Sequence, residues 1–155
     1  MTTPQRVKTV YLDTNIYNRP FDDQSQVRIR LETIAIFSIL HHIKRSDFQL
    51  LWSFMIDFEN SLNPYIDNRL EISLMASIAK LWIGPDEKIR NAGKRYERAG
   101  IKPRDALHLA CAIQGVADIF ITCDDKLAKR AKLMQLPILI FNPVDFVYAM
   151  EVQQL

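Results

Sequence analysis

Hydrophobic and polar positions along the chain fall into blocks that predict strands separated by helices. Five short runs are largely apolar and rich in β-branched or aromatic residues, which is typical of strands buried on both faces of a sheet. These runs span residues 9–12, 48–52, 81–83, 118–122 and 136–141. Between residues 18 and 23, a proline and paired acids predict a polar loop instead.

The stretches between the strand runs predict helices, because their apolar residues recur at i, i+3, i+4 and i+7. Ser53 and Asn142 are favourable N-caps for two of them. Pro103 suits the first turn of another, which Gly115 would close. The predicted helices cover residues 26–44, 54–62, 65–80, 89–99, 103–114, 126–132 and the segment after Asn142.

The order of these elements predicts an α/β fold. Strands made of apolar runs and joined through helices favour a three-layer α/β/α arrangement with a central parallel sheet of four to five strands. The chain has 155 residues, and 48% of them are hydrophobic. That length fits one domain with one core, so we predict a single domain over residues 1–155.

The predicted helix 26–44 has an apolar stripe wider than one face. Ile36, Ile39, Leu40 and Ile43 mark one side, and further apolar residues extend the stripe around the helix. A stripe this wide indicates burial on two sides. We therefore expect a second subunit against this helix, in a homodimer.

Charge and composition exclude some functions. Lys and Arg number 20 against 18 Asp and Glu, and a net charge of +2 is too small to argue nucleic-acid binding by itself. No run of about 18 apolar residues occurs, so neither a membrane span nor a secretory signal is expected. The prediction is a cytoplasmic protein. Cys111 and Cys123 match no zinc or redox pattern and are interpreted as buried thiols.

Four acids lie at or soon after junctions that lead into predicted helices. Asp13 and Asp124 each follow a strand run. Glu59 lies within two turns of Ser53, and Asp105 lies in the first turn of the helix that starts at Pro103. The carboxyl ends of parallel strands share one edge of a sheet, where ligands bind.

Convergence of these acids would need a counterion. Two unit charges 4 Å apart repel by roughly 4 kcal/mol at the effective dielectric of a protein surface. Oxygen ligands without His or Cys among them favour Mg²⁺ or Mn²⁺ over zinc. Each acid also has a structural interpretation: Asp13 or Asp124 could cap a helix, Asp105 could interact with a helix dipole, and Glu59 could be solvated. His108, one turn after Asp105, is interpreted as a packed or hydrogen-bonded structural histidine.

Three segments together resemble the acidic motifs of PIN domains. They are Tyr11-Leu12-Asp13-Thr14-Asn15, the segment from Lys102 to Ala110, and the segment from Ala117 to Asp124. The similarity spans nearly the whole chain in the right order and spacing. The loop at residues 18–23 resembles a variant found in part of the family rather than the commonest toxin pattern.

The resemblance implies a metal-dependent endoribonuclease that leaves 5′-phosphate and 3′-hydroxyl ends. This family is best known for the toxin half of type II toxin–antitoxin pairs, so the implied partners are RNA and a cognate antitoxin. Asp13, Asp105 and Asp124 would ligate Mg²⁺ or Mn²⁺. Glu59 matches the family's second acid, although Asp57 lies about 200° from it on a helix and only one can face the site.

Further residues follow from the same resemblance and from their position near the edge. Thr14, Asn15 and Thr122 would orient Asp13 or a bound water. Basic side chains that could hold the phosphate backbone flank the edge. They are Arg19, Arg104, Lys126, Lys129 and Arg130.

Other classes of protein compete with this interpretation. A haloacid-dehalogenase-like phosphatase needs a second Asp where Asn15 stands, and a receiver module needs a Lys after a late strand, where Phe141 and Asn142 stand. The alternative that stays open is a non-catalytic PIN-like module that binds RNA or protein. Retention of all four acids favours the enzyme.

Overall fold

The computed structural model describes residues 3–153 and 155, and within them five parallel strands form one sheet. Residues 1–2 and 154 of the predicted domain lie outside the described residues. The strand order is β3-β2-β1-β4-β5. The strands are β1 (Thr9–Leu12), β2 (Gln49–Ser53), β3 (Leu81–Ile83), β4 (Ile119–Ile121) and β5 (Leu139–Phe141). The predicted parallel sheet is confirmed.

Strand β1 occupies the centre of the sheet because it is apolar on both faces. Val10, Tyr11 and Leu12 are fully buried. Tyr11 lies in register with Leu51 of β2 on one side and Phe120 of β4 on the other. All strands run in the same direction, so the polar residues at their carboxyl ends meet at one edge.

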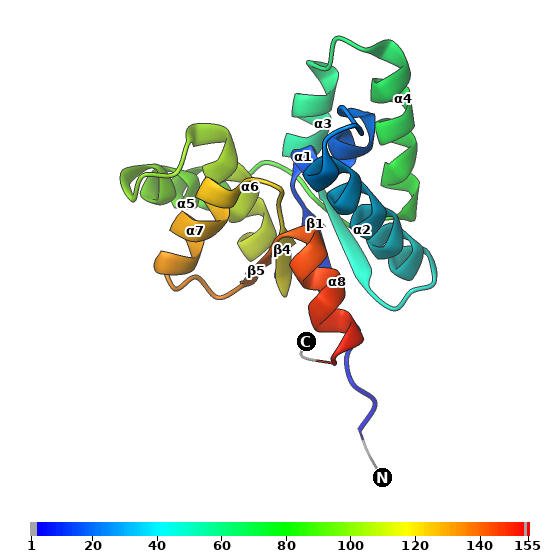
Figure 1. Cartoon of the computed structure of the whole chain (residues 1–155). Coiled ribbons are helices and arrows are strands. Elements are labelled where there is room, and N and C mark those ends of the chain that lie inside the picture. The colour runs from blue at the N-terminus through cyan, green and yellow to red at the C-terminus, as the bar shows by residue number, and fades with distance from the viewer. Residues whose placement is uncertain (1–2, 154) are drawn as a thin grey trace.

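Helices cover both faces of the sheet, as the three-layer prediction required (Figure 1). Helices α5, α6 and α7 lie on one side, and α2 and α4 lie on the other, with α8 beside α2. The helices in the first half are α1 (Thr14–Asn18), α2 (Val27–Lys44), α3 (Phe54–Ser61) and α4 (Ile66–Met75). The later ones are α5 (Glu87–Arg98), α6 (Pro103–Gln114), α7 (Asp125–Leu133) and α8 (Pro143–Glu151).

The predicted loop at residues 18–23 was wrong in part. Helix α1 starts directly after Asp13 and ends at Asn18, and a 3-10 helix, Arg19–Phe21, follows. Pro20 fits there because the first turn of a helix does not need its missing N–H. The predicted helix 65–80 also divides, into α4 and a 3-10 turn at Ala76–Ile78.

The predicted caps of two helices are in place. The Ser53 hydroxyl accepts a hydrogen bond from the Ile56 amide, and the Asn142 side chain accepts one from the Val144 amide. Gly115 ends α6 where a Cβ atom would lie 2.3 Å from Leu51. These residues set where the helices begin and end, and therefore which side chains reach the sheet edge.

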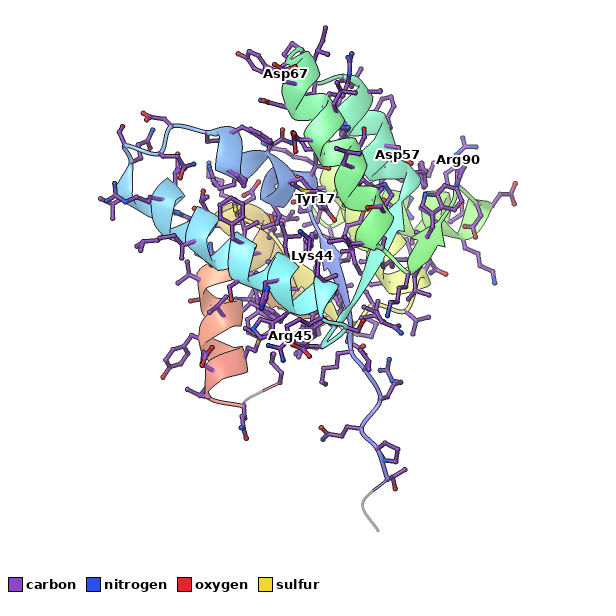
Figure 2. The ribbon with its side chains drawn as sticks, turned by 90° about the vertical axis from the view of Figure 1, so that its right-hand side faces the viewer. Tyr17, Lys44, Arg45, Asp57, Asp67 and Arg90 are labelled. Carbon is purple, nitrogen blue, oxygen red and sulfur yellow. The ribbon has the colours of Figure 1, made fainter. Side chains whose placement is uncertain are left out.

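Helix α2 buries one side of its apolar stripe and exposes the other. Ile36, Ile39 and Ile43 belong to the core, whereas Ile34 and Phe37 are more than half exposed. Figure 2 looks onto this face, where Tyr17 lies between α2 and α4. One side of the helix is therefore buried within this chain. Burial of the other side, against a second subunit, stays a prediction. Within the described ranges, no helix has the length and apolar character to cross a membrane.

Candidate metal centre

Asp13 directly follows β1 and receives hydrogen bonds on both carboxylate oxygens. Oδ1 accepts from the Thr14 amide at 2.8 Å, and Oδ2 accepts from the Thr122 hydroxyl at 2.8 Å and from Asn15 Nδ2 at 3.1 Å. The side chain is buried, and burial raises the pKa of its carboxyl despite the opposing charge of His108. Thr14, Asn15 and Thr122, the three residues expected to orient Asp13, therefore each donate a hydrogen bond to its carboxylate.

Glu59 reaches the same place from α3. Its Oε1 accepts hydrogen bonds from His108 Nε2 and from the Thr14 hydroxyl, the latter at 3.1 Å. Burial acts to raise the pKa of Glu59, but the hydrogen bond from His108, the charge of His108 and the hydrogen bond from Thr14 together outweigh it, and this pKa lies below the ordinary value. Asp57 points elsewhere, because its carboxylate accepts a hydrogen bond from the indole of Trp52 at 2.8 Å. Glu59 is therefore the acid of α3 that lies at the site.

His108 is fully buried between these acids and hydrogen-bonded at both ring nitrogens, as the interpretation of a packed, hydrogen-bonded histidine predicted. Its Nε2 faces Glu59 and lies 3.9 Å from Asp13 Oδ1, while its Nδ1 hydrogen-bonds to the Tyr11 hydroxyl at 2.6 Å. Burial acts to lower the pKa of His108, but the hydrogen bond to Glu59 and the charge of Asp13 raise it above its usual value. One ligand atom each from Asp13, Glu59 and His108 lie within 4.8 Å of one another.

Asp105 and Asp124 face a cavity of about 190 Å³ beside this group. Asp124 caps α7, and its Oδ1 accepts the amides of Lys126 and Leu127, both at 3.0 Å. Because both amides use Oδ1, Oδ2 is the oxygen that can face a cation. Burial, followed by the negative charges of Asp13 and Asp124, raises the pKa of Asp105 to about 6.

The charge balance of the site fits a divalent cation. Burial is the main reason why ionising Asp105 is costly, and the negative charges of Asp13, Asp124 and Glu59 add to this penalty. A cation among these carboxylates would remove that penalty. His108 adds a nitrogen to the predicted all-oxygen set, and an imidazole is a better ligand for Mn²⁺ than for Mg²⁺. Among the described residues, the ligand atoms that meet within 4.8 Å are those of Asp13, Glu59 and His108, whereas Asp105 and Asp124 line the cavity.

Four of the five predicted basic residues lie on the cavity, on a neighbouring hollow or beside Glu59, and Arg19 lies apart from them. Lys126 and Arg130 line the cavity with Asp105 and Asp124, and Lys129 lines a neighbouring hollow with both of them. Arg104 lies over the ring of Phe58, with its guanidinium 4.0 Å from Glu59.

Arg19 points to other acids. It contacts Asp22 at 3.0 Å and the buried Glu32 at 3.6 Å.

Three contributions to the site could not be found from the sequence. His108 reaches Glu59 because α3 packs against α6, which no local spacing reveals. Lys102 lines the cavity as the residue before the first turn of α6. Arg28 lies on α2, far from the acidic motifs in sequence, and contacts Cys123 and Asp125 on either side of Asp124, while Glu32 of the same helix binds Arg28.

Comparison with known proteins agrees with the fold and the acidic edge. The model of the PIN domain family matches residues 10–133, and the chain belongs to this family. The crystal structure of VapBC2 from Rickettsia felis, bound to a promoter DNA fragment, contains a similar chain. It is 16% identical, with a TM-score of 0.58, over 86% of this chain and 98% of that one.

A second similar structure is FitAcB from Neisseria gonorrhoeae. It is 18% identical, with a TM-score of 0.56, and the match covers 86% of this chain and 97% of that chain. No curated protein matches the sequence. Similarity at these identities establishes the fold, and function has to be argued from the site.

Proposed function

We propose that the protein is a metal-dependent endoribonuclease of the PIN family that hydrolyses RNA phosphodiester bonds. The observation that carries the proposal is the geometry of the acids: ligand atoms of Asp13, Glu59 and His108 lie within 4.8 Å of one another, and Asp105 and Asp124 line one cavity. A surface that only binds RNA gains nothing from mutually repelling acids, because RNA is itself an anion. One domain over residues 1–155 would contain the whole site.

Each group has a part in this proposal. Bound Mg²⁺ or Mn²⁺ would supply an activated water and neutralise charge on the reacting phosphate. Asp13, Asp105, Asp124 and Glu59 would hold the ion.

Neighbouring side chains would keep these acids in place. Thr14, Asn15 and Thr122 would do so through the hydrogen bonds that they donate to them. His108 would hold Glu59 from the core side.

The RNA would approach across the basic rim of the cavity. Lys126, Lys129 and Arg130 of α7 and Arg104 of α6 present their charges next to the acids, where they can contact phosphates on either side of the cut. Arg19 would support the site from within, because Asp22 and Glu32 occupy its guanidinium.

The test is cleavage of structured and unstructured RNA by the purified protein with Mn²⁺. We expect products with 5′-phosphate ends, and no cleavage by Asp13→Asn or in the presence of EDTA. Asp57→Asn is the matched control, since it makes the same change at an acid that lies away from the site. Cleavage that survives in Asp13→Asn would contradict the proposal, and RNA binding without any cleavage would favour the non-catalytic module.

A protein partner is part of the proposal. The VapBC2 structure is a complex with a promoter DNA fragment, and a toxin–antitoxin role would give this chain an antitoxin partner. The exposed apolar side of α2, which includes Leu31 and Ile34, would pair with a second copy in a homodimer. We propose a cytoplasmic enzyme, in the compartment that holds its RNA substrate.

A further inference from the structure

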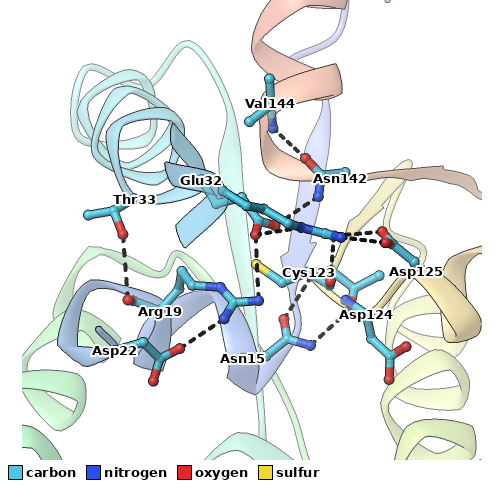
Figure 3. Close-up of polar contacts among 12 residues, drawn as sticks. Asn15, Arg19, Asp22, Glu32, Thr33, Cys123, Asp124, Asp125, Asn142 and Val144 are labelled. Carbon is cyan, nitrogen blue, oxygen red and sulfur yellow. Dashed lines mark hydrogen bonds and ion pairs between the residues drawn. The ribbon is translucent and has the colours of Figure 1, made fainter. Parts of the chain in front are cut away.

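A polar network joins α2 to the loop that carries Asp124 (Figure 3). Its centre is Glu32, one turn into α2, which is 1% exposed. The carboxylate accepts hydrogen bonds from Arg28 Nε at 3.2 Å and from Asn142 Nδ2 at 2.8 Å, and Arg19 lies 3.6 Å away. A buried acid with two hydrogen-bond donors and a further ion pair is fixed in one orientation.

Arg28 connects this fixed acid to the loop. Its two Nη atoms bind both oxygens of Asp125, at 2.6 and 2.8 Å, and Nη2 also donates to the carbonyl of Cys123 at 3.4 Å. A two-pronged contact of this kind sets distance and orientation together. The residue between these two contacts is Asp124. One guanidinium therefore contacts the residues on both sides of a proposed metal ligand, through the Cys123 carbonyl and the Asp125 carboxylate.

The same segment is held from the metal side. The Cys123 amide donates to Asn15 Oδ1 at 3.0 Å, and the Asp124 amide donates to the Thr122 hydroxyl at 3.1 Å. Asn15 and Thr122 both bind Asp13 Oδ2. Asp13 and Asp124 are thus linked through two residues, and Arg28 is the contact that ties this assembly to a rigid helix.

We propose that Arg28, oriented by Glu32, is a positioning residue that sets the place of Asp124 relative to Asp13 and so determines metal affinity. This inference rests on the proposed function. It predicts a change in metal affinity opposite to the one expected from charge alone. Removing a positive charge near a cation site should strengthen cation binding if charge alone matters. Positioning predicts the opposite, a weakening.

The experiment measures Mn²⁺ affinity by calorimetry at fixed pH and ionic strength for the wild-type chain, Arg28→Ala and Arg30→Ala. Arg30 is the matched control, because it is an exposed arginine two residues away on the same helix. We expect Arg28→Ala to weaken binding roughly 10- to 100-fold, the range found when residues that support metal ligands are removed. Arg30→Ala should bind as the wild type does.

A double-mutant cycle tests the route of the effect. In an Asp124→Asn background, Arg28→Ala should add no further loss, because the ligand that it positions is already gone. Cleavage by Arg28→Ala should recover at saturating Mn²⁺ with the KM for RNA unchanged, which a general loss of folding would not produce. Arg28→Lys keeps the positive charge but loses the two-pronged contact, so its Mn²⁺ affinity should lie between those of the wild type and Arg28→Ala. This variant also tests the inference if Arg28→Ala folds poorly.

The failures are distinguishable. If Arg28→Ala binds Mn²⁺ as tightly as the wild type or more tightly, the inference is overturned and the proposed function stands. The same holds if Arg28→Ala lowers the Mn²⁺ affinity of Asp124→Asn as much as it lowers that of the wild type. Absence of Mn²⁺ binding by the wild-type chain overturns the metal centre itself, and the inference with it.

Discussion

The Thr122 hydroxyl donates a hydrogen bond to Asp13 Oδ2 at 2.8 Å, although the two residues lie 109 positions apart in the chain. They meet because β4 and β1 are parallel neighbours, with Leu12 in register with Ile121. The same hydroxyl accepts hydrogen bonds from Asn15 and from the Asp124 amide. One side chain therefore joins two of the proposed metal ligands.

Thr122→Val should reduce both stability and metal affinity. Valine keeps the shape of threonine, so the change removes the hydroxyl and leaves the buried partners without it. We expect a loss of about 1–3 kcal/mol in the free energy of unfolding, measured in urea, and about a tenfold loss in Mn²⁺ affinity. Thr9→Val makes the same substitution at the opposite end of β1 and should leave Mn²⁺ affinity unchanged. Equal effects of the two variants on metal binding would rule out a specific role for the hydroxyl.

Glu59 and Asp57 should separate function from stability. Glu59→Gln removes a charge from the proposed metal site and should lower cleavage at least tenfold. Asp57→Ala leaves the buried indole of Trp52 without its acceptor and should cost about 1–3 kcal/mol of stability while cleavage persists. Cleavage rates and urea unfolding curves of both variants check this. The reverse pattern would mean that Asp57 is the acid that serves the site.

The sheet and most helices could be predicted from the sequence because their signals are local. Apolar runs such as Val10 to Leu12 identify buried strands, and Ser53 or Asn142 identifies the start of a helix. Helix α1 escaped prediction because five residues are too few to show helical periodicity. Its signal was Asp13, which caps it by accepting the Thr14 amide.

The acids of the site could also be predicted, whereas their contacts could not. Helical geometry predicts that Asp57 and Glu59 point in different directions. Only the position of Trp52, which binds Asp57, decides which acid faces the site. The approach of His108 to Glu59 depends on how α3 and α6 pack. Contacts between distant elements leave no periodic trace in the sequence, and the support of Asp125 by Arg28 is of the same kind.

Asp105→Asn should make the metal-free protein more stable and the metal response weaker. The substitution removes a charge that Asp13 and Asp124 repel. If the repulsion amounts to about 1 kcal/mol, the melting temperature without metal rises by roughly 2–4 °C. The wild-type chain at a Mn²⁺ concentration 100 times Kd should gain about 2.7 kcal/mol. Thermal melts with and without Mn²⁺ check both statements. If Mn²⁺ stabilises Asp105→Asn as much as it stabilises the wild type, Asp105 is not a metal ligand.

Asp118 should make stability depend on acid pH at the far end of the sheet. Burial acts to raise the pKa of Asp118, but the Arg6 guanidinium at 2.6 Å and the Thr9 amide at 2.8 Å outweigh it, so this pKa lies below its ordinary value. A lowered pKa means that the carboxylate stabilises the fold above the unfolded value near 4, and that this contribution is lost as the pH falls below it.

Asp118→Asn should therefore be less stable than the wild type at pH 7, by roughly a factor of two to five in the unfolding equilibrium constant. The gap should narrow as the pH falls from 7 to 3, and high salt should narrow it at pH 7. Urea unfolding at both pH values gives the comparison. A gap that stays the same at pH 3 would mean that the carboxylate charge contributes nothing and that the loss is due to packing.

The exposed side of α2 should hold two copies of the chain together. Val27, Leu31, Ile34 and Phe37 recur at helical spacing and are each more than half exposed, which is unusual for a monomer surface. Placing a charge in such a contact would bury it without a partner, so Ile34→Glu should convert the dimer to a monomer in light scattering. Leu133→Glu makes the same change on α7, in the opposite layer, and should leave the dimer intact. A wild-type chain that stays monomeric across the concentration range would instead assign this face to a different partner protein.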